Sequence, residues 1–598
     1  MTEWMNAIDN GQFMIKKASN VREGVFLSES GKSAEITIWC KDAKTCKLCL
    51  YEENKLRHKI PMFSMKEMGA QDLFSVRLEG QGLVDFLNCF EYTFEADRRI
   101  VNDPFMRAVA GRDVFGKKPG KLRGRFCLES FDWSDENRIS IPYEDMILYQ
   151  CHLRGYTKHS SSGVKHPGTF AGFCEKIPYI KELGVNTILF LPLYDFNERM
   201  YADEKKINYW GYTGDACYFA PKASYAVEGA DAVREMKQMI KTLHQNGMNL
   251  FLDMHFVDRS PEFILKCLIY YVTEFHVDGF LVNSQVVSEE WLLADPFLRN
   301  CKFLSGDWKR AERVGGERKL AQFNDEYMTV ARRYLKSDEG QAGDFYQCFR
   351  KDEKEMGRIH YITQKNGFTL RDLVSYDVKH NEANGERNTD GTEFNYSWNC
   401  GQEGVSRKRV VNQMRLRQTK NAFCMLFLGL ATPMLLAGDE FGRSQKGNNN
   451  AYCQDNASTW LDWSLLEKNQ QIYKFCHQLI QFRREHPLYQ RREILSGMDT
   501  LGVGAPGVSC HGIEPWEANF SYYSREVGIL FYGTYYSGKS LYIVFNFHWD
   551  AHDFYLPVIN ATKKWNVILD TDDEKQNKSN VKKYMVSPRS VVVFESVE

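Results

Sequence analysis

Three things are scarce in this chain of 598 residues: excess charge of one sign, long apolar runs and cysteine. Its 77 basic and 78 acidic residues leave a formal net charge of -1, and nucleic-acid-binding proteins usually carry a basic excess. The longest apolar stretch, near Ala422–Ala437, is broken by glycine and proline and is too short to span a bilayer. The composition therefore argues against a nucleic-acid-binding or membrane-spanning protein.

The 16 cysteines are scattered, and the single C-x-x-C has no second pair nearby that would complete a zinc site. We therefore expect reduced thiols, no metal and no cofactor. The first residues, MTEWMNAIDNGQFMIKK, contain early acids and no apolar core of a signal peptide, so we expect a cytoplasmic protein. Aromatic residues, by contrast, make up 14% of the chain, which suits large cores and stacking on sugar rings.

The chain divides into three segments that differ in their pattern of apolar and β-favouring residues. Residues 1–120 contain short runs of β-favouring residues, such as 33–40, and predict a β-sandwich followed by a basic linker at 117–125. Residues 143–486 alternate short apolar strands with helical patterns, which is typical of parallel β-α units. Their number favours an α/β fold with a (β/α)8 barrel, whose chemistry lies at the carboxyl ends of the strands. Residues 487–598 return to strands and predict a C-terminal β domain.

Four long stretches carry a specific resemblance. They read GYTKHSSSGVKHPGTFAGFCEKIPYIKELGVN (155–186), NYWGYTGDACYFAPKASYA (208–226), NGFTLRDLVSYDVKHNEANGE (366–386) and TPMLLAGDEFGRSQKGNNNAYCQDN (432–456). The chain resembles isoamylases and glycogen-debranching enzymes of the α-amylase superfamily, glycoside hydrolase family 13. The resemblance covers essentially the whole chain. It implies an α-glucan ligand such as glycogen or starch, and a glycogen-binding-like domain at 1–120.

The same resemblance implies where catalytic groups should lie. Retaining glycosidases use a carboxylate nucleophile and a carboxylic acid. Where the family has G-F-R-x-D after the fourth strand, this chain has GFLVN, which leaves Leu281 at the arginine and Asn283 at the nucleophile position. Where the family has K-L-I-A-E-P-W, this chain has KFLSGDW, which leaves Gly306 at the position of the acid. The A-H-D-G-F-T-L motif reads QKNGFTL, which places Lys365 and Asn366 at the histidine and third-carboxylate positions.

The third strand shows a further departure from the family pattern. It keeps Asp253 but loses the Asn-His pair, and only residues 254–260 stand where the family has a long capping insertion. A carboxamide is a poor nucleophile, and glycine has no side chain. No catalytic residue is therefore intact, and the resemblance implies a scaffold that has lost its chemistry.

Several residues remain candidates for binding a glucan. They are Tyr149, Trp210, Tyr212, Asp253, Trp308 and Lys365. Core packing is an equally good explanation for Tyr149 and Trp210. The basic stretch 309–319 is expected near the barrel mouth, where it would suit an anionic ligand, unless it is a solvated loop with paired charges. Asp439 and Glu440 match a structural loop after the eighth strand and receive no catalytic role.

Three hypotheses follow for the function. The first is a non-catalytic protein of α-glucan metabolism that binds glucan or serves as a regulatory subunit beside an active debranching enzyme. The second is an active α-1,6-glucan debranching hydrolase that uses relocated groups such as Asp253, Asp258 and Asp307. The third is a sensor of an anionic sugar metabolite in the remodelled cleft.

Overall fold

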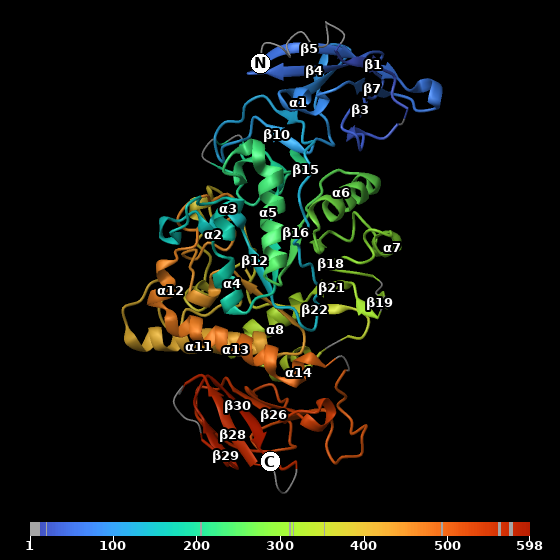
Figure 1. Ribbon diagram of the computed structural model, residues 1–598. Coiled ribbons are helices and arrows are strands. Elements are labelled where there is room, and N and C mark those ends of the chain that lie inside the picture. Colours follow the sequence, from blue (N-terminus) through green and yellow to red (C-terminus); the bar gives the residue numbers. More distant parts are fainter. Residues whose placement is uncertain are drawn as a thin grey trace.

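The computed structural model describes residues 12–597 apart from residues 20, 202, 204–205, 310–312, 315, 352, 492–493, 560–563 and 573–577. Residues 1–11, on which the expectation of no signal peptide rests, lie outside this range. Three bodies follow one another along the molecule: a β domain at the N-terminal end, a barrel in the middle and a second β domain at the C-terminal end (Figure 1).

The N-terminal domain is built from two sheets that face each other across an apolar core. One sheet has the order β1-β7-β3-β2 with β6 beside β7, and the other has the order β10-β11-β8-β4-β5 with β9 beside β8. The core between them includes Ile36, Leu48, Val76 and Phe94, all of which are fully buried. The elements are β1 (Met14–Lys16), β2 (Gly24–Leu27), β3 (Ser33–Trp39), β4 (Cys46–Glu52), β5 (Lys55–Pro61), β6 (Phe63–Ser64), β7 (Leu73–Glu79), α1 (Leu83–Asn88), β8 (Glu91–Ala96), β9 (Arg99–Val101), β10 (Ala108–Ala110) and β11 (Arg123–Arg125).

The segment 117–125 is not only a linker, as the sequence predicts, because its last residues form β11. This strand pairs with both β8 and β10, so the sheet extends beyond residue 120. The side chain of Arg123 is buried and donates to Glu91 at 2.8 Å. Sequence patterning missed the strand because its charged residues find partners only after the sheet has assembled.

A closed barrel of eight parallel strands forms the middle of the molecule, in the order β12-β13-β16-β17-β18-β21-β22-β23, and confirms the expected (β/α)8 class. Its strands are β12 (Leu148–Cys151), β13 (Thr187–Phe190), β16 (Asn249–Asp253), β17 (Gly279–Leu281), β18 (Lys302–Ser305), β21 (Leu320–Phe323), β22 (Gly357–His360) and β23 (Thr432–Leu436). Between β16 and the next helix lie only residues 254–260, so no capping subdomain covers this part of the mouth.

Helices and short hairpins connect these strands. The helices are α2 (Leu153–Thr157), α3 (Phe170–Cys174), α4 (Ile177–Leu183), α5 (Ala232–Gln245), α6 (Pro261–Phe275), α7 (Glu289–Ala294), α8 (Asp325–Lys336), α9 (Ala342–Phe349), α10 (Leu370–Leu373), α11 (Arg409–Leu428), α12 (Ser464–Lys468), α13 (Gln470–Glu485) and α14 (Pro487–Gln490). The additional strands in this region are β14 (Tyr194–Phe196), β15 (Ala216–Pro221), β19 (Arg313–Val314) and β20 (Glu317–Arg318).

Local sequence explains where several of these helices begin and end. Helix α6 begins after Ser260, whose hydroxyl accepts from the backbone N–H of Phe263 at 3.2 Å, and its first residue is proline. The sequence pattern of residues 173–183 predicts one helix, but the structure has two, because Pro178 lacks an N–H and sits in the first turn of α4. The pattern of residues 464–486 likewise predicts one helix, which the structure breaks at Asn469, whose amide donates to the backbone oxygen of Phe441 at 2.9 Å.

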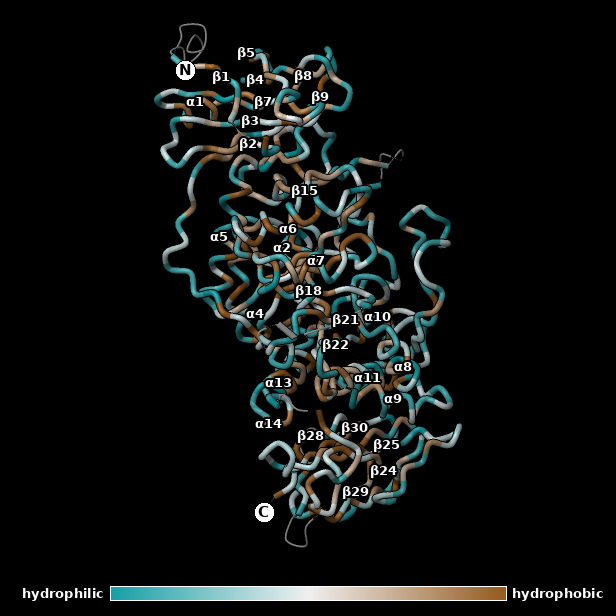
Figure 2. The backbone as a smooth tube through the Cα atoms, turned by 90° about the vertical axis from the view of Figure 1, so that its right-hand side faces the viewer, coloured by the Kyte–Doolittle hydropathy of each residue, from teal (hydrophilic) through white to brown (hydrophobic). Residues whose placement is uncertain are grey.

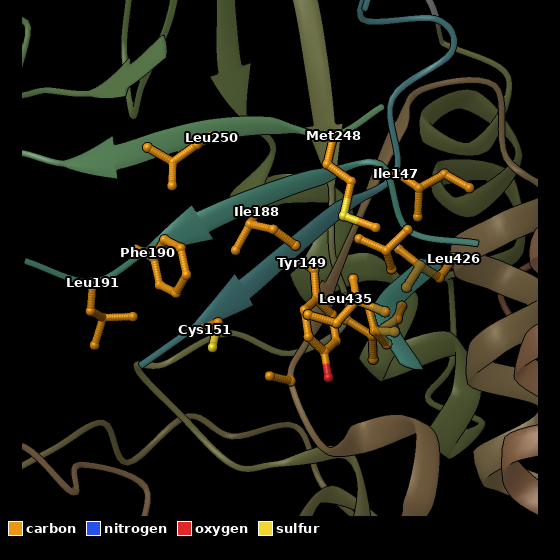
Figure 3. Close-up of a cluster of buried hydrophobic side chains, with 14 of the residues drawn as sticks. Ile147, Tyr149, Cys151, Ile188, Phe190, Leu191, Met248, Leu250, Leu426 and Leu435 are labelled. Carbon is orange, nitrogen blue, oxygen red and sulfur yellow. The ribbon is translucent and has the colours of Figure 1, made fainter. Parts of the chain in front are cut away.

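The barrel strands alternate between two buried faces. Ile188 and Phe190 on β13, Leu250 on β16 and Tyr149 on β12 belong to one apolar cluster, which Figure 3 shows beside the strands. Burial on both faces is typical of parallel strands covered by helices. The apolar segments accordingly run through the middle of the barrel (Figure 2).

The C-terminal domain is a five-stranded antiparallel sheet with a second, two-stranded sheet. Its strands are β24 (Val508–His511), β25 (Glu526–Phe531), β26 (Leu541–Asn546), β27 (His552–Tyr555), β28 (Lys564–Asp570), β29 (Lys583–Val586) and β30 (Ser590–Val597). It packs on the barrel through aromatic rings: Tyr334 lies 4.7 Å from Phe547, and Phe345 lies 5.0 Å from Phe545, between centroids. Within the described part of the chain, no helix is both long and apolar enough to cross a membrane.

Arg483 stabilises the turn between α11 and the last barrel strand, β23. It is buried on α13 and donates to the backbone oxygens of Phe427, Gly429 and Ala431 at 2.9, 2.6 and 2.7 Å. We predict that Arg483→Met lowers the free energy of unfolding by about 2–4 kcal/mol, because it leaves buried carbonyls without donors. Urea denaturation followed by tryptophan fluorescence measures this loss. Arg484→Met, at the exposed neighbouring position, is the control and should stay within about 0.5 kcal/mol of wild type.

Candidate functional site

The three positions that the family pattern assigns to carboxylates lie on loops that follow barrel strands. Asn283 follows β17 and is exposed, and its side-chain oxygen accepts from the backbone N–H of Gln285 at 2.9 Å. Gly306 follows β18, is exposed, and would have no heavy atom within 4 Å of an added Cβ. Asn366 is exposed on the loop after β22. None of these three residues can ionise as a carboxylic acid.

The three acidic residues considered as relocated catalytic groups differ in burial and in their hydrogen-bond partners. Asp307 is exposed and accepts from the hydroxyl of Ser284 at 2.6 Å, which joins the loops after β17 and β18. Asp258 is exposed and has a positive φ of 50°. Asp253 alone is buried, at 5% exposure, at the end of β16.

A compact cluster surrounds Asp253. The Lys365 ammonium lies 2.6 Å from Oδ2 of Asp253, and the hydroxyl of Tyr212 also contacts both Asp253 and Lys365. The Lys365 nitrogen lies 4.3 Å from the centroid of the Tyr212 ring. The exposed ring of His255 lies against the other side of Tyr212, at 4.8 Å between centroids. The structure thus joins three of the predicted binding candidates, Tyr212, Asp253 and Lys365, in direct contact.

One residue that the sequence reasoning missed holds this cluster in place. Gln150, in β12, is buried, and its side-chain oxygen accepts from the backbone N–H of Lys365 at 2.8 Å. This hydrogen bond ties the loop after β22 to the first barrel strand. A polar residue inside a run of apolar strand residues is the signal that could have identified it.

Burial opposes the charged forms of both partners in this pair. It raises the pKa of the Asp253 carboxyl and lowers the pKa of the Lys365 ammonium, since each loses hydration. The mutual attraction at 2.6 Å works in the opposite direction on both groups. Each partner therefore depends on the other to remain charged at this depth.

Most of the aromatic candidates belong to the core instead of the cleft surface. Tyr149 is fully buried, and its hydroxyl donates to Glu440 at 2.6 Å. Trp308, expected at the barrel mouth, is 6% exposed, and its indole N–H donates to the backbone oxygen of Ala321 at 3.0 Å. Trp210 is 8% exposed and packs edge-on against Tyr212. Buried rings cannot stack on a sugar without moving, so Tyr212 is the accessible one of these four rings.

The loop after β23 is structural, as its sequence predicts. Asp439 and Glu440 are both buried. Asp439 accepts from the backbone N–H of Leu370 at 2.9 Å, and Glu440 accepts from Tyr149 and from Tyr179, at 3.0 Å for the latter. Their carboxylates are occupied in holding neighbouring segments together.

The basic stretch 309–319 does not gather at the barrel mouth. Residues 310–312 and 315 lie outside the described residues, but Arg318 and Lys319 stand at the amino end of β21, at the opposite end of the barrel. Arg318 pairs with Glu144 at 3.0 Å, and Lys319 pairs with Glu317 at 2.9 Å. The expectation of a basic mouth is wrong for these residues, because the stretch runs down the barrel side to the next strand.

The space beside the cluster is small. A cavity of about 30 Å³ touches Lys365, whereas pockets for small-molecule ligands enclose roughly 300–1,000 Å³. Its walls are Gln150, His152, Gly155, Tyr156, Leu191, Tyr209, Trp210, Lys365, Leu436, Ala437, Arg443, Gln445, Thr459 and Leu461. This cavity has room for water-sized molecules.

Comparison with known proteins places this architecture in a family. Residues 128–264 match the α-amylase catalytic-domain model. The glycogen debranching enzyme of Erwinia tasmaniensis is 31% identical over 78% of this chain and 84% of its own length. This chain belongs to the isoamylase and glycogen-debranching group of the α-amylase superfamily.

A second relative and two solved structures are also similar to this chain, the structures in fold. Chloroplastic isoamylase 1 of Oryza sativa is 30% identical over 74% of this chain and 66% of its own length, just under two thirds. The catalytic module of the pneumococcal glycogen-degrading virulence factor SpuA shares the fold, with a TM-score of 0.73, 16% identity and 99% of both chains covered. Pullulanase type I from Bacillus subtilis, solved with maltose, has a TM-score of 0.72 at 18% identity and covers 98% of this chain and 86% of its own.

We predict that Lys365→Met destabilises this isoamylase-like chain by about 3 kcal/mol near pH 8 and by less near pH 5. Without the ammonium, the buried Asp253 carboxyl has a pKa above its unfolded value of about 4. The folded state then binds more protons than the unfolded state between the two pKa values, so stability of the variant falls as pH rises. Thermal unfolding midpoints at the two pH values measure this difference.

Lys474→Met, at an exposed position on α13, is the matched control and should change stability little at either pH. An equal loss of stability for Lys365→Met at both pH values would contradict the role assigned to the buried pair.

Proposed function

We propose that this protein is a non-catalytic, α-glucan-binding member of the isoamylase and glycogen-debranching group, which acts as a binding or regulatory subunit. The observation that carries the proposal is the replacement of all three expected carboxylates by Asn283, Gly306 and Asn366. Glycosidic hydrolysis by the family's route needs a nucleophile and an acid, and neither position supplies one.

The remaining acid of the cleft supports the same conclusion. Asp253 is buried, at 5% exposure, and is engaged by Lys365 and Tyr212. A buried carboxyl that two protein groups already hold is poorly placed to reach a glycosidic oxygen. Paired charges at Arg318 and Lys319 likewise give the anionic-metabolite sensor less support.

The N-terminal domain offers a surface suited to a glucan. Phe63, Ser75 and Thr37 lie opposite one another across β6, β7 and β3, and therefore on one face of the sheet. Trp39, two residues beyond Thr37 on the same face, is 52% exposed, and Phe63 is 38% exposed. Thr37 and Ser75 themselves are buried, at 1% and 0% exposure, and their hydroxyls are hydrogen-bonded to each other at 2.6 Å. The feature that suits a glucan is therefore the pair of partly exposed rings, which can stack on the apolar faces of sugar rings.

The names of the relatives indicate the ligand class. They are isoamylases and glycogen debranching enzymes, and one structural neighbour holds maltose. By extension, we propose glycogen or a starch-like glucan as the ligand here, an active debranching enzyme as the partner, and a cytoplasmic location.

The purified chain is expected to release no reducing ends from pullulan or amylopectin above a no-enzyme control. Loss of a catalytic unit lowers rates by about 10⁶-fold, which places residual turnover below detection. A reducing-sugar assay with an active debranching enzyme as positive control measures this.

Turnover that is abolished in Asp307→Asn but retained in Asp258→Asn would overturn the proposal in favour of a hydrolase with a relocated acid. Both aspartates are exposed, so the two variants are matched in their expected effect on stability.

The chain is also expected to be retarded in native gels that contain amylopectin, and Trp39→Ala is expected to weaken this binding about tenfold, or ~1.4 kcal/mol. Trp291→Ala removes an equally exposed ring, at 49%, from α7 on the barrel and should leave retardation unchanged. Absence of retardation in the wild-type chain, together with failure to co-purify a debranching enzyme, would refute the binding role.

A further inference from the structure

Three side chains able to bind a metal ion converge in the C-terminal domain, far along the chain from the barrel cleft. Glu526 begins β25, His548 lies just beyond the end of β26, and His552 begins β27. One ligand atom from each lies within 4.8 Å of the others. Their side chains are partly buried, at 11%, 19% and 23% exposure, so an ion could enter from solvent without unfolding the domain.

The spacing of these atoms fits a small tetrahedral ion. Nε2 of His552 lies 3.3 Å from Nδ1 of His548 and 3.7 Å from Oε1 of Glu526. Zinc binds histidine nitrogen and carboxylate oxygen at about 2.0–2.2 Å, which requires ligand atoms about 3.3–3.6 Å apart at the edges of a tetrahedron. These two distances therefore need changes of only a few tenths of an ångström, and the ligand atoms of the third pair, His548 and Glu526, lie within 4.8 Å of each other.

A fourth ligand is available from the same loop. Oδ2 of Asp550 lies 3.6 Å from Nδ1 of His548, and Asp550 is exposed, so its side chain is free to turn toward an ion. The sequence H-W-D-A-H thus supplies three candidate donors within five residues. Binding would replace two hydrogen bonds, one between Nε2 of His552 and Nδ1 of His548 at 3.3 Å and one from the backbone N–H of Asp550 to Nδ1 of His548 at 3.0 Å. The ion takes the place of the first, and water can accept from the exposed N–H of Asp550.

The neighbouring cation, Arg525, does not compete with an ion for the carboxylates of Glu526 and Asp550. The nearest cation along the chain, Arg525, is directed away, because it donates to the backbone oxygen of Ser337 at 3.1 Å and pairs with Glu339 at 3.4 Å. Oε2 of Glu526 accepts from the backbone N–H of Arg525 at 2.9 Å, which leaves Oε1 directed to the histidines. This hydrogen bond orients the carboxylate as a supporting partner of a metal ligand does.

We infer that Glu526, His548 and His552 form a zinc site, with Asp550 or water as the fourth ligand. Two imidazoles and a carboxylate favour Zn²⁺ over Ca²⁺ and Mg²⁺, which prefer oxygen ligands alone. Four protein ligands would make the site structural, whereas a water in the fourth position would leave it open.

The position of the site indicates what the ion would stabilise. The loop that carries His548 contacts the barrel at the end of α8: Phe547 accepts a hydrogen bond from Ser337 through its backbone oxygen, and its ring packs against Tyr334. The backbone oxygen of His548 accepts from Arg589 at 3.0 Å. An ion that links this loop to β25 would therefore stabilise the interface between the barrel and the C-terminal domain.

The test uses the untagged full-length chain after dialysis against EDTA and then buffer. Isothermal titration with ZnCl₂ is expected to show one high-affinity site, and Zn²⁺ is expected to raise the thermal midpoint, because an ion that binds only the folded state stabilises it. MgCl₂ and CaCl₂ at the same concentrations are expected to give no shift. Co²⁺ is expected to give the visible absorption typical of four-coordinate nitrogen and oxygen ligation.

Two variants and one control assign the site. His552→Ala and Glu526→Gln are each expected to weaken zinc binding at least tenfold and to remove the shift in thermal midpoint. His477→Ala, a partly buried histidine on α13, should leave both unchanged, and far-UV circular dichroism of the metal-free variants checks that they fold. No stoichiometric zinc binding to the wild-type chain, or binding that survives in His552→Ala, would overturn the inference and leave a hydrogen-bonded histidine pair.

Discussion

Closure of the barrel is the constraint on which the rest of the structure depends. β12 pairs with β23 as well as with β13, so strands that lie almost 300 residues apart meet, with Leu148 beside Met434. Because the strands are parallel, their carboxyl ends share one mouth, and the loops after β16, β17, β18 and β22 are held together there. The altered positions are neighbours for this reason, and the two β domains rest on the outside of the same body.

Within that mouth, Asp253 and Lys365 form a buried pair in direct contact. Desolvation of two charges is costly, and the contact at 2.6 Å together with Tyr212 offsets that cost. The same contact occupies Asp253, the buried acid at the end of β16. A scaffold can keep its strands, its apolar core and its packing while such a change removes the chemistry, because the core depends on burial and the chemistry depends on a few ionisable groups.

Much of this fold was predictable from periodicity, since strands and helices that bury an apolar face carry it in their sequence. The (β/α)8 barrel and the short connection at 254–260 appear as predicted. The expectations that the structure did not bear out share one physical cause. They concern polar or aromatic segments whose surroundings come from distant parts of the chain, namely β11, Trp308 and the stretch at 317–319. Arg318 meets Glu144 only after the barrel has formed, so local pattern could not show that its charge is paired.

The sequence by itself determined that the catalytic carboxylates are missing. Asn283, Gly306 and Asn366 cannot act as carboxylic acids in any conformation. Only the tertiary structure decided which of the remaining groups meet. Asp253 and Lys365 stand 112 residues apart and touch because parallel strands bring their ends together. Glu526 reaches the histidines near residue 550 because β25 and β26 pair side by side. Chemistry is a property of residue types, whereas proximity follows from the packing of strands that the local sequence does not specify.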